Sequence, residues 1–209
     1  MLKAPLFCLA TPYQFILASN SPRRQQFLAD WGIPFTVLAC IDEPDPFEGE
    51  SPTTFTKRSA KYKADYAKQQ SATTSIILAA DTVVAQDGKI LGKPANEQEA
   101  LDMLRNLNGR KHTVTTSMHL YWPIDVSTES LSITDECTVF FRKFTDSILS
   151  AYVRTKEPWD KAGAYAIQGQ GAFLVERIEG CWATVVGLPL PLLADELLQR
   201  KLLLPCTLS

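Results

Sequence analysis

The 209-residue chain predicts an α/β fold in which a mixed, twisted sheet carries flanking helices and borders a central cleft. Short apolar runs of strand length alternate with amphipathic runs of helix length along the chain, a pattern typical of α/β domains. The Asp87-Gly88 pair lies between two extended stretches and predicts a hairpin, hence antiparallel strands. Helical crossovers between other strands favour parallel pairs, so we expect a mixed sheet.

The first predicted elements are bounded by clear start and stop residues. A buried strand is expected over residues 15–18, and a helix follows from Pro22, capped by Ser21. Gly32 should end that helix, because glycine readily adopts the left-handed conformation found at helix ends. A second strand is predicted over residues 33–40, before a polar loop rich in proline.

The middle of the chain repeats these signals. Ser51 and Pro52 open a helix that should reach about Gln70, and residues 76–80 form a buried strand that ends at Asp81. Asn96, with a glutamate three residues later, resembles a capping box and starts the next helix, which continues to Gly109. The elements predicted after it are strands over 112–122 and 131–141, a helix from Thr145 to Val153, a hairpin formed by 172–178 and 182–186, and a helix over 191–203.

Composition narrows the class of protein. With 21 basic and 23 acidic residues, the formal net charge of −2 disfavours nucleic-acid binding through bulk electrostatics. The five cysteines are scattered and contain no CxxC pair, which predicts reduced thiols in a cytoplasmic protein with no zinc site and no disulfide. No apolar run approaches membrane-spanning length, so no membrane association is expected. Residues 1–13 are interpreted as a non-essential extension to a single domain over 14–209.

The sequence SNSPRR, residues 19–24, raises an electrostatic question. Arg23 and Arg24 lie in the first turn of a predicted helix, where the helix dipole is already positive. Free backbone N–H groups and the hydroxyls of Ser19 and Ser21 converge at the same point, which is typical of an anion site. In the alternative interpretation, both arginines are solvated residues of an ordinary first turn.

Three other residues are candidates for chemistry. Asp81 is predicted at the end of a buried strand, where functional groups of α/β proteins often lie, and a buried carboxylate needs a partner. Lys93 is held in the short Gly-Lys-Pro loop, although this motif by itself is more often a solvated loop lysine. Glu43, in an acidic loop, could bind a hard cation through oxygen, or could simply be solvated.

Several common sites are not indicated. His112 and His119 fit a strand surface, and neither belongs to an HxH or HExxH motif. The GQG of residues 169–171 is too short for a dinucleotide fingerprint, and the sequence contains no GxxxxGK[ST]. A Rossmann dehydrogenase and a P-loop kinase are therefore disfavoured.

The motifs taken together resemble the Maf family of nucleoside triphosphate pyrophosphatases over about residues 14–200. The matching stretches are SNSPRR, AADTVV (79–84), GKP (92–94), NGRKHTVTT (108–116), EPWDKAGAYAIQGQGA (157–172) and VVGLPL (185–190). The resemblance implies a Maf/ITPase-like fold. It also implies cleavage of a nucleoside triphosphate between its α and β phosphates with a divalent cation, Mg²⁺ or Mn²⁺.

The resemblance also implies roles for individual residues. Asp81 matches the catalytic aspartate that accepts a proton, and Asp81 and Glu43 match acidic positions that can hold the metal. Positions matching phosphate-binding residues are Ser19, Ser21, Arg23, Arg24, Lys63 and Lys93. Arg23, Thr82 and Gln168 match the positions linked to choice of base, where this sequence follows the branch that prefers dTTP and UTP. Asn108 departs from the more common serine, outside this set.

The expected reaction is an attack by water, oriented or activated by Asp81, on the α-phosphorus, while cations stabilise the developing charge. Gln168 offers a donor and an acceptor to the imide edge of uracil or thymine, including modified pyrimidine nucleotides. The partner is then the nucleoside triphosphate, with no nucleic acid or membrane expected; a homodimer is compatible with the resemblance, although nothing marks an interface. The alternatives are a non-enzymatic nucleotide- or DNA-binding regulator of cell division and an enzyme acting on non-canonical purines.

Overall fold

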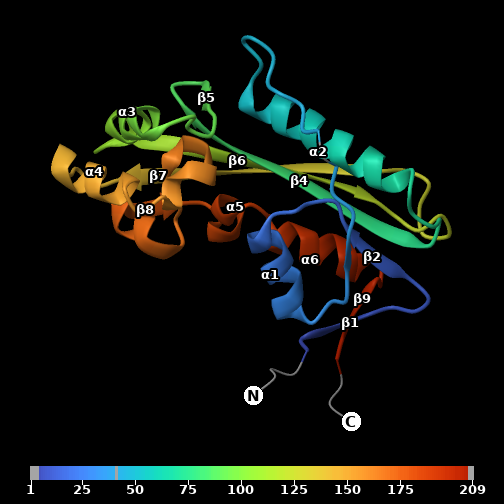
Figure 1. Ribbon diagram of the computed structural model, residues 1–209. Helices are drawn as coiled ribbons and strands as arrows, with labels where there is room; N and C mark the ends of the chain where they lie inside the picture. Colours follow the sequence, from blue (N-terminus) through green and yellow to red (C-terminus); the bar gives the residue numbers. More distant parts are fainter. Residues whose placement is uncertain (1–4, 41, 207–209) are drawn as a thin grey trace.

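A twisted seven-stranded sheet forms the centre of the protein (Figure 1). The computed structural model describes residues 5–40 and 42–206. The strands follow the order β3-β2-β4-β6-β7-β8, and β5 pairs with β4. β2 runs parallel to both β3 and β4, whereas all other pairs are antiparallel, which confirms the predicted mixed sheet. The strands are β2 (Gln14–Leu17), β3 (Thr36–Val37), β4 (Ser75–Gln86), β5 (Lys89–Leu91), β6 (Lys111–Tyr121), β7 (Leu131–Phe141) and β8 (Val175–Glu179).

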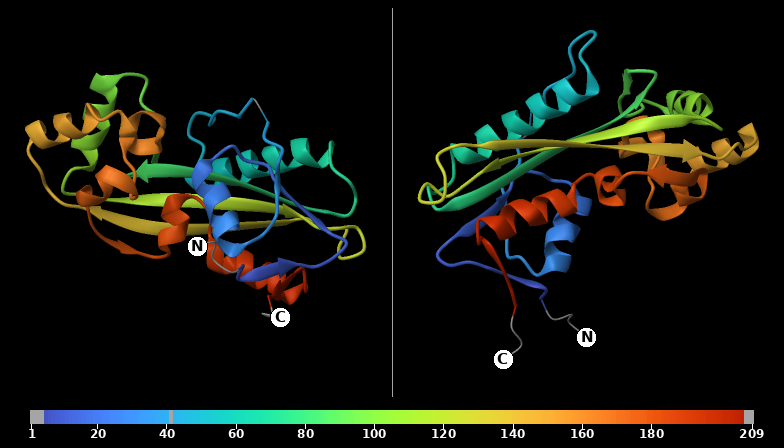
Figure 2. Two further views of the ribbon diagram at one scale, coloured as in Figure 1. Left: turned by 60° about the horizontal axis from the view of Figure 1, so that its bottom comes forward. Right: turned by 180° about the vertical axis from the view of Figure 1, so that it is seen from behind.

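Helices cover both faces of this sheet. α2 (Pro52–Lys68) lies along β4 and β6 on one face, and α1 (Pro22–Trp31), α5 (Trp182–Val186) and α6 (Leu190–Gln199) lie on the other (Figures 1 and 2). α3 (Glu97–Leu107) and α4 (Asp146–Val153) pack together at one end of the long strands. Within residues 5–40 and 42–206, no helix has both the length and the apolar character needed to cross a bilayer.

The predicted helix starts are confirmed by their backbone geometry. Pro22 is the first residue of α1, and Gly32 ends that helix in the left-handed conformation. In α2, the Ser51 side chain accepts a hydrogen bond from the Thr54 amide at 3.1 Å. Asn96 caps α3 in the same way, its Oδ1 accepting from the Glu99 amide at 2.9 Å. The Ser51 and Asn96 caps are hydrogen bonds within four residues, so the local sequence is sufficient to predict them. Ser21 precedes α1 as predicted, but its side chain makes no capping hydrogen bond.

Strand β4 differs from its prediction in a way that matters for the site. The prediction that the strand ends at Asp81 is wrong, since β4 continues to Gln86 and Asp81 lies in its middle, paired with Ser117 of β6. The parallel neighbour β2 stops at Leu17, opposite Leu78. Between that point and Val84, where β5 begins to pair, one edge of β4 is open, so Asp81 still lies past the end of a parallel pair.

Three other segments were predicted incorrectly or only in part. Residues 182–186 form helix α5 instead of a strand, with Ala183, Thr184 and Val186 buried between the sheet and the neighbouring helices. Tertiary packing therefore overrides the strand preference of the β-branched residues. The strand predicted over 33–40 is reduced to Thr36–Val37, and the closing helix ends at Gln199, before β9 (Leu203–Pro205).

Both histidines lie on β6, but inside the protein instead of on a strand surface. His112 and His119 are each buried, with hydrogen bonds to the Tyr165 hydroxyl at 2.8 Å and to the Ser132 hydroxyl at 2.6 Å. Burial lowers the pKa of each ring to about 4. Both imidazoles are therefore neutral near pH 7.

A disulfide joins Cys8 to Cys206, which corrects the expectation of five reduced cysteines. β1 (Phe7–Leu9) pairs antiparallel with β9, and this brings cysteines 198 positions apart to a Cα–Cα distance of 5.3 Å. The sequence interpretation looked for closely spaced pairs, and only the folded chain places these two together. Phe7 also packs edge-to-face on Trp31 of α1, so residues 7–9 are part of the folded structure.

Replacing Cys8 with Ser is expected to lower the free energy of unfolding by about 2–4 kcal/mol. The disulfide closes a loop of almost the whole chain and thereby restricts the unfolded state. Urea unfolding without reductant measures the change. Cys181→Ser, at a partly buried free cysteine, is the matched control and should change the stability less. Equal stabilities of the Cys8→Ser variant and the wild type would contradict this role of the disulfide.

Candidate active site

One cavity of about 320 Å³ gathers all ten residues that the sequence nominated. It lies where the edge of β4 is open, between the start of α1, the Glu43 loop, the Lys93 loop and the segment over 160–168. Its volume is within the range of small-molecule sites. The nominated residues on its wall are Ser19, Ser21, Arg23, Arg24, Glu43, Lys63, Asp81, Thr82, Lys93 and Gln168.

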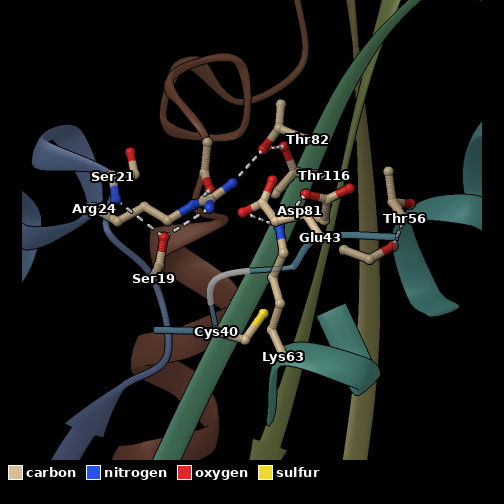
Figure 3. Close-up of polar contacts among 12 residues, drawn as sticks. Ser19, Ser21, Arg24, Cys40, Glu43, Thr56, Lys63, Asp81, Thr82 and Thr116 are labelled. Carbon is tan, nitrogen blue, oxygen red and sulfur yellow. Dashed lines mark hydrogen bonds and ion pairs between the residues drawn. The ribbon is translucent and has the colours of Figure 1, made fainter. Parts of the chain in front are cut away.

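Arg24 is buried and ties three elements together. Its Nε donates to the Gly187 carbonyl at 2.8 Å, while its two terminal nitrogens donate to Ser19 Oγ and Thr82 Oγ1 at 3.0 Å each (Figure 3). Burial lowers the pKa of the guanidinium, and the nearby Asp81 carboxylate opposes that shift. Arg24 therefore positions the walls of the cavity and also contributes positive charge to it.

The start of α1 presents backbone donors to the cavity. The Ser21 side chain makes no capping hydrogen bond, and the Ser21 amide donates to Ser19 Oγ at 3.3 Å. The amides of the first helical turn have no acceptor within the helix, by the geometry of α-helices. Arg23 lies beside them, half-buried, with Asp160 as a nearby charge that opposes the lowering of its pKa by burial. This arrangement is suited to an anion.

Lys63 stands between two carboxylates on the other side of the cavity. Its Nζ lies 2.7 Å from Asp81 Oδ1 and 3.0 Å from Glu43 Oε1 (Figure 3). The side chains of Lys63 and Asp81 are 4% and 14% exposed, whereas that of Glu43 is 58% exposed. Partial burial alone would raise the pKa of Glu43, but Lys63 lowers it, with help from Lys93 and Arg24.

The side chains of Asp81 and Thr82, successive residues of β4, point to opposite faces of the sheet. Asp81 points toward α2 and reaches Lys63, whereas Thr82 points toward α1 and α5. Thr82 Oγ1 bonds to Thr116 Oγ1 at 2.9 Å as well as to Arg24. Both residues line one cavity because β2 has ended, which leaves this edge of β4 accessible from both faces.

A metal ion fits this donor set only when phosphate oxygens complete its coordination. Glu43 and Asp81 each bring an oxygen within 3.0 Å of the same Nζ, so two hard oxygen donors converge. Elsewhere too, the described part of the chain contains no group of three histidine, cysteine, aspartate or glutamate side chains arranged for a metal. Mg²⁺ is commonly held by one or two carboxylates together with substrate phosphates.

Three wall residues with titratable side chains were not nominated from the sequence. Asp160, Lys161 and Tyr165 line the cavity, and Asp160 is ion-paired with Lys161. The signal that could have found the first two is the charged run EPWDK, directly before a segment rich in glycine. Only Gln168 was taken from that stretch.

A family model and curated relatives match most of the chain. The family model described as "Maf-like protein" matches residues 14–200. A dTTP/UTP pyrophosphatase of Oleidesulfovibrio alaskensis is 46% identical over 91% of this chain and 86% of its own length. A protein of the same name from Nitratidesulfovibrio vulgaris is 48% identical over 88% and 87%. A solved structure of a nucleoside-triphosphatase/dITP/XTP pyrophosphatase from Mycobacterium abscessus aligns with a TM-score of 0.41 at 13% identity, over 90% and 96%.

Proposed function

Because the chain belongs to the Maf family, we propose that it is a hydrolase that converts dTTP and UTP to the monophosphate and pyrophosphate. Two relatives named dTTP/UTP pyrophosphatase are 46% and 48% identical to it over the aligned residues. The observation that carries the proposal is the joining, in one cavity, of the start of α1 with the Asp81–Lys63–Glu43 cluster. The start of α1 can bind phosphates, and the carboxylates of the cluster can orient the attacking water and accept its proton.

The reaction follows from the charges around the cavity. A triphosphate carries about four negative charges, so its α-phosphorus becomes open to attack only where cations surround it. Arg23, Arg24 and Lys93 supply positive charge, and the first turn of α1 supplies N–H donors. Asp81, held at Oδ1 by Lys63, accepts the proton of a water aligned with the α-phosphorus, and pyrophosphate leaves on the opposite side.

A divalent cation, Mg²⁺ or Mn²⁺, belongs to this proposal. Glu43 and Asp81 would hold it together with the phosphates, and it would neutralise charge on the leaving group. Lys63 already contacts both carboxylates, so we assign it first to positioning them and only then to the phosphates.

We also propose a domain organisation and a cellular compartment for the protein. We interpret residues 14–209 as one domain, against which the strand over 7–9 packs, and assign the protein to the cytoplasm, where nucleoside triphosphates are made. Neither a membrane nor a nucleic acid enters the proposed reaction, and a homodimer is compatible with it. A non-enzymatic regulator of cell division is not favoured, because a binding protein has no need of a carboxylate on a buried lysine beside the phosphate site.

Gln168→Ala is expected to lose most of the preference for dTTP and UTP, by about tenfold or more, since its amide would no longer pair with the base. Initial rates of pyrophosphate release over dTTP, UTP, CTP, ATP and GTP with Mg²⁺ measure both the activity and the preference. Gln170→Ala is a matched control, because Gln170 is also exposed but does not line the cavity. An unchanged preference in Gln168→Ala would remove Gln168 from base recognition. An inactive wild type would contradict the proposed function.

A further inference from the structure

The segment Ala166–Gly171 carries Gln168 into the cavity without belonging to a strand or an α-helix. Ala166, Ile167 and Gln168 line the cavity, and a short 3₁₀ helix begins at Gly169. Strand hydrogen bonds do not fix such a segment, so other groups must determine where Gln168 lies. The structure contains those groups at both ends of the segment.

The Glu157 carboxylate holds the far end of the segment. Its Oε2 accepts from the Gln170 amide at 2.9 Å, and its Oε1 accepts from the Gly171 amide at 2.8 Å. The Tyr152 hydroxyl also donates to Oε1, at 2.9 Å. One carboxylate therefore satisfies two successive backbone donors and one side-chain donor, a use of both oxygens that is open to an ionised carboxylate.

Tyr152 connects the same carboxylate to the near end of the segment. Its hydroxyl oxygen accepts from the Ala166 amide at 3.2 Å while its proton goes to Glu157. Tyr152 belongs to α4, and its ring is buried in the hydrophobic cluster that α4 shares with α3, which fixes the hydroxyl in place. The path from Ala166 through Tyr152 and Glu157 to Gln170 and Gly171 closes a hydrogen-bonded ring around Gln168. We call these two side chains, Glu157 and Tyr152, the clamp.

The two glycines of the GQG sequence allow the clamp to come this close. A Cβ atom at Gly169 would lie 2.6 Å from Glu157 Oε2, and one at Gly171 would overlap the Tyr152 hydroxyl oxygen. Gly169 also has a φ of +81°, a conformation that favours glycine. The GQG stretch, which is too short for a dinucleotide fingerprint, thus has a physical explanation.

The charge state of Glu157 suits the clamp. Partial burial alone would raise the pKa of Glu157. The hydrogen bonds from the amides of Gln170 and Gly171 and from the Tyr152 hydroxyl lower it by more, so the net shift is downward. At neutral pH the Glu157 carboxylate is therefore ionised, and it can accept hydrogen bonds but not donate them. A glutamine at this position would turn an NH₂ group toward at least one backbone N–H.

We propose that Glu157, through Tyr152 and the amides of residues 170 and 171, is a positioning residue for base selection that holds Gln168 against the nucleobase. The inference rests on the proposed function, in which Gln168 contacts the base. Glu157 lies outside the cavity wall, so it acts through the segment and does not touch the substrate. Loss of a clamp hydrogen bond should therefore reduce the preference between bases more than it reduces the rate of hydrolysis.

The test compares Glu157→Gln and Tyr152→Phe with the wild type on UTP and CTP. Glu176→Gln, at an exposed glutamate of β8, is the matched control. We expect the ratio of kcat/KM for UTP to that for CTP to fall about tenfold in Glu157→Gln and in the same direction in Tyr152→Phe, with the control unchanged. Peptides covering 166–171 should exchange their amide hydrogens faster in both clamp variants.

A merely structural role would lower both rates by the same factor through a smaller folded fraction, and would leave the ratio unchanged. An unchanged ratio in Glu157→Gln, with or without faster amide exchange, overturns the inference while the proposed function stands. A wild type that hydrolyses dTTP, UTP, CTP, ATP and GTP at similar rates overturns the proposed base choice, and the inference with it. The two failures are therefore distinguishable.

Discussion

Asp81→Asn is expected to reduce kcat for UTP by about 10²- to 10⁴-fold, the usual contribution of a general base, while nucleotide binding remains measurable. The amide keeps the shape of the side chain but cannot accept the proton of water. Stopped-time assays of pyrophosphate release give kcat, and calorimetric titration with UTP gives Kd. The expected pattern is a large change in kcat with a small change in Kd.

Asp87→Asn is the matched control for this substitution. Asp87 directly follows the same strand, is exposed, pairs with Arg110 and lies outside the cavity. Its left-handed backbone is well tolerated by asparagine, so the control should fold and turn over normally. An Asp81→Asn enzyme with wild-type turnover would exclude Asp81 as the proton acceptor.

Lys63→Met is expected to lower kcat by about 10²-fold, comparable to the loss of one electrostatic contact in a catalytic site. Without the ammonium, the Asp81 and Glu43 carboxylates face each other unpaired, and the pKa of Glu43 rises because Lys63 lowers it. The acid limb of the pH profile should therefore move to higher pH. Measuring kcat from pH 5 to 9 tests both effects.

Lys61→Met separates the site from a general effect of charge. Lys61 lies on the same helix two residues away, is 54% exposed and pairs with Asp65. The pH profile of kcat for the Lys61→Met variant should match that of the wild type. Lys63→Arg keeps the charge and should leave the acid limb close to its original position. A Lys63→Met enzyme whose pH profile coincides with that of the wild type would contradict the role of Lys63.

The sequence predicted best where neighbouring residues decide the structure. α1 begins after Ser21, although the Ser21 side chain makes no capping hydrogen bond, and Gly32 ends it through its own amide. Asn96 caps α3 with its side chain. The ten nominated site residues also line one cavity. Whether each has its assigned role stays a prediction until the variants are measured.

The remaining features depend on contacts between distant parts of the chain. The segment 182–186 has the composition of a strand, yet it is helical because it packs under the sheet. The Cys8–Cys206 disulfide requires β1 and β9 to meet, and the bonding of Lys63 to two carboxylates requires α2 to lie over β4. No local pattern encodes these distances. The clamp on Gln168 was missed for the same reason, since Tyr152 carries no motif of its own.

Hydrolysis of UTP in water enriched in ¹⁸O tests the central claim, that this site directs water to the α-phosphorus. Mass spectrometry of the products locates the oxygen that water supplied. We predict unlabelled pyrophosphate and one ¹⁸O atom in the phosphate of UMP. Label in pyrophosphate, or release of UDP with labelled orthophosphate, would place the attack on another phosphorus and contradict the account.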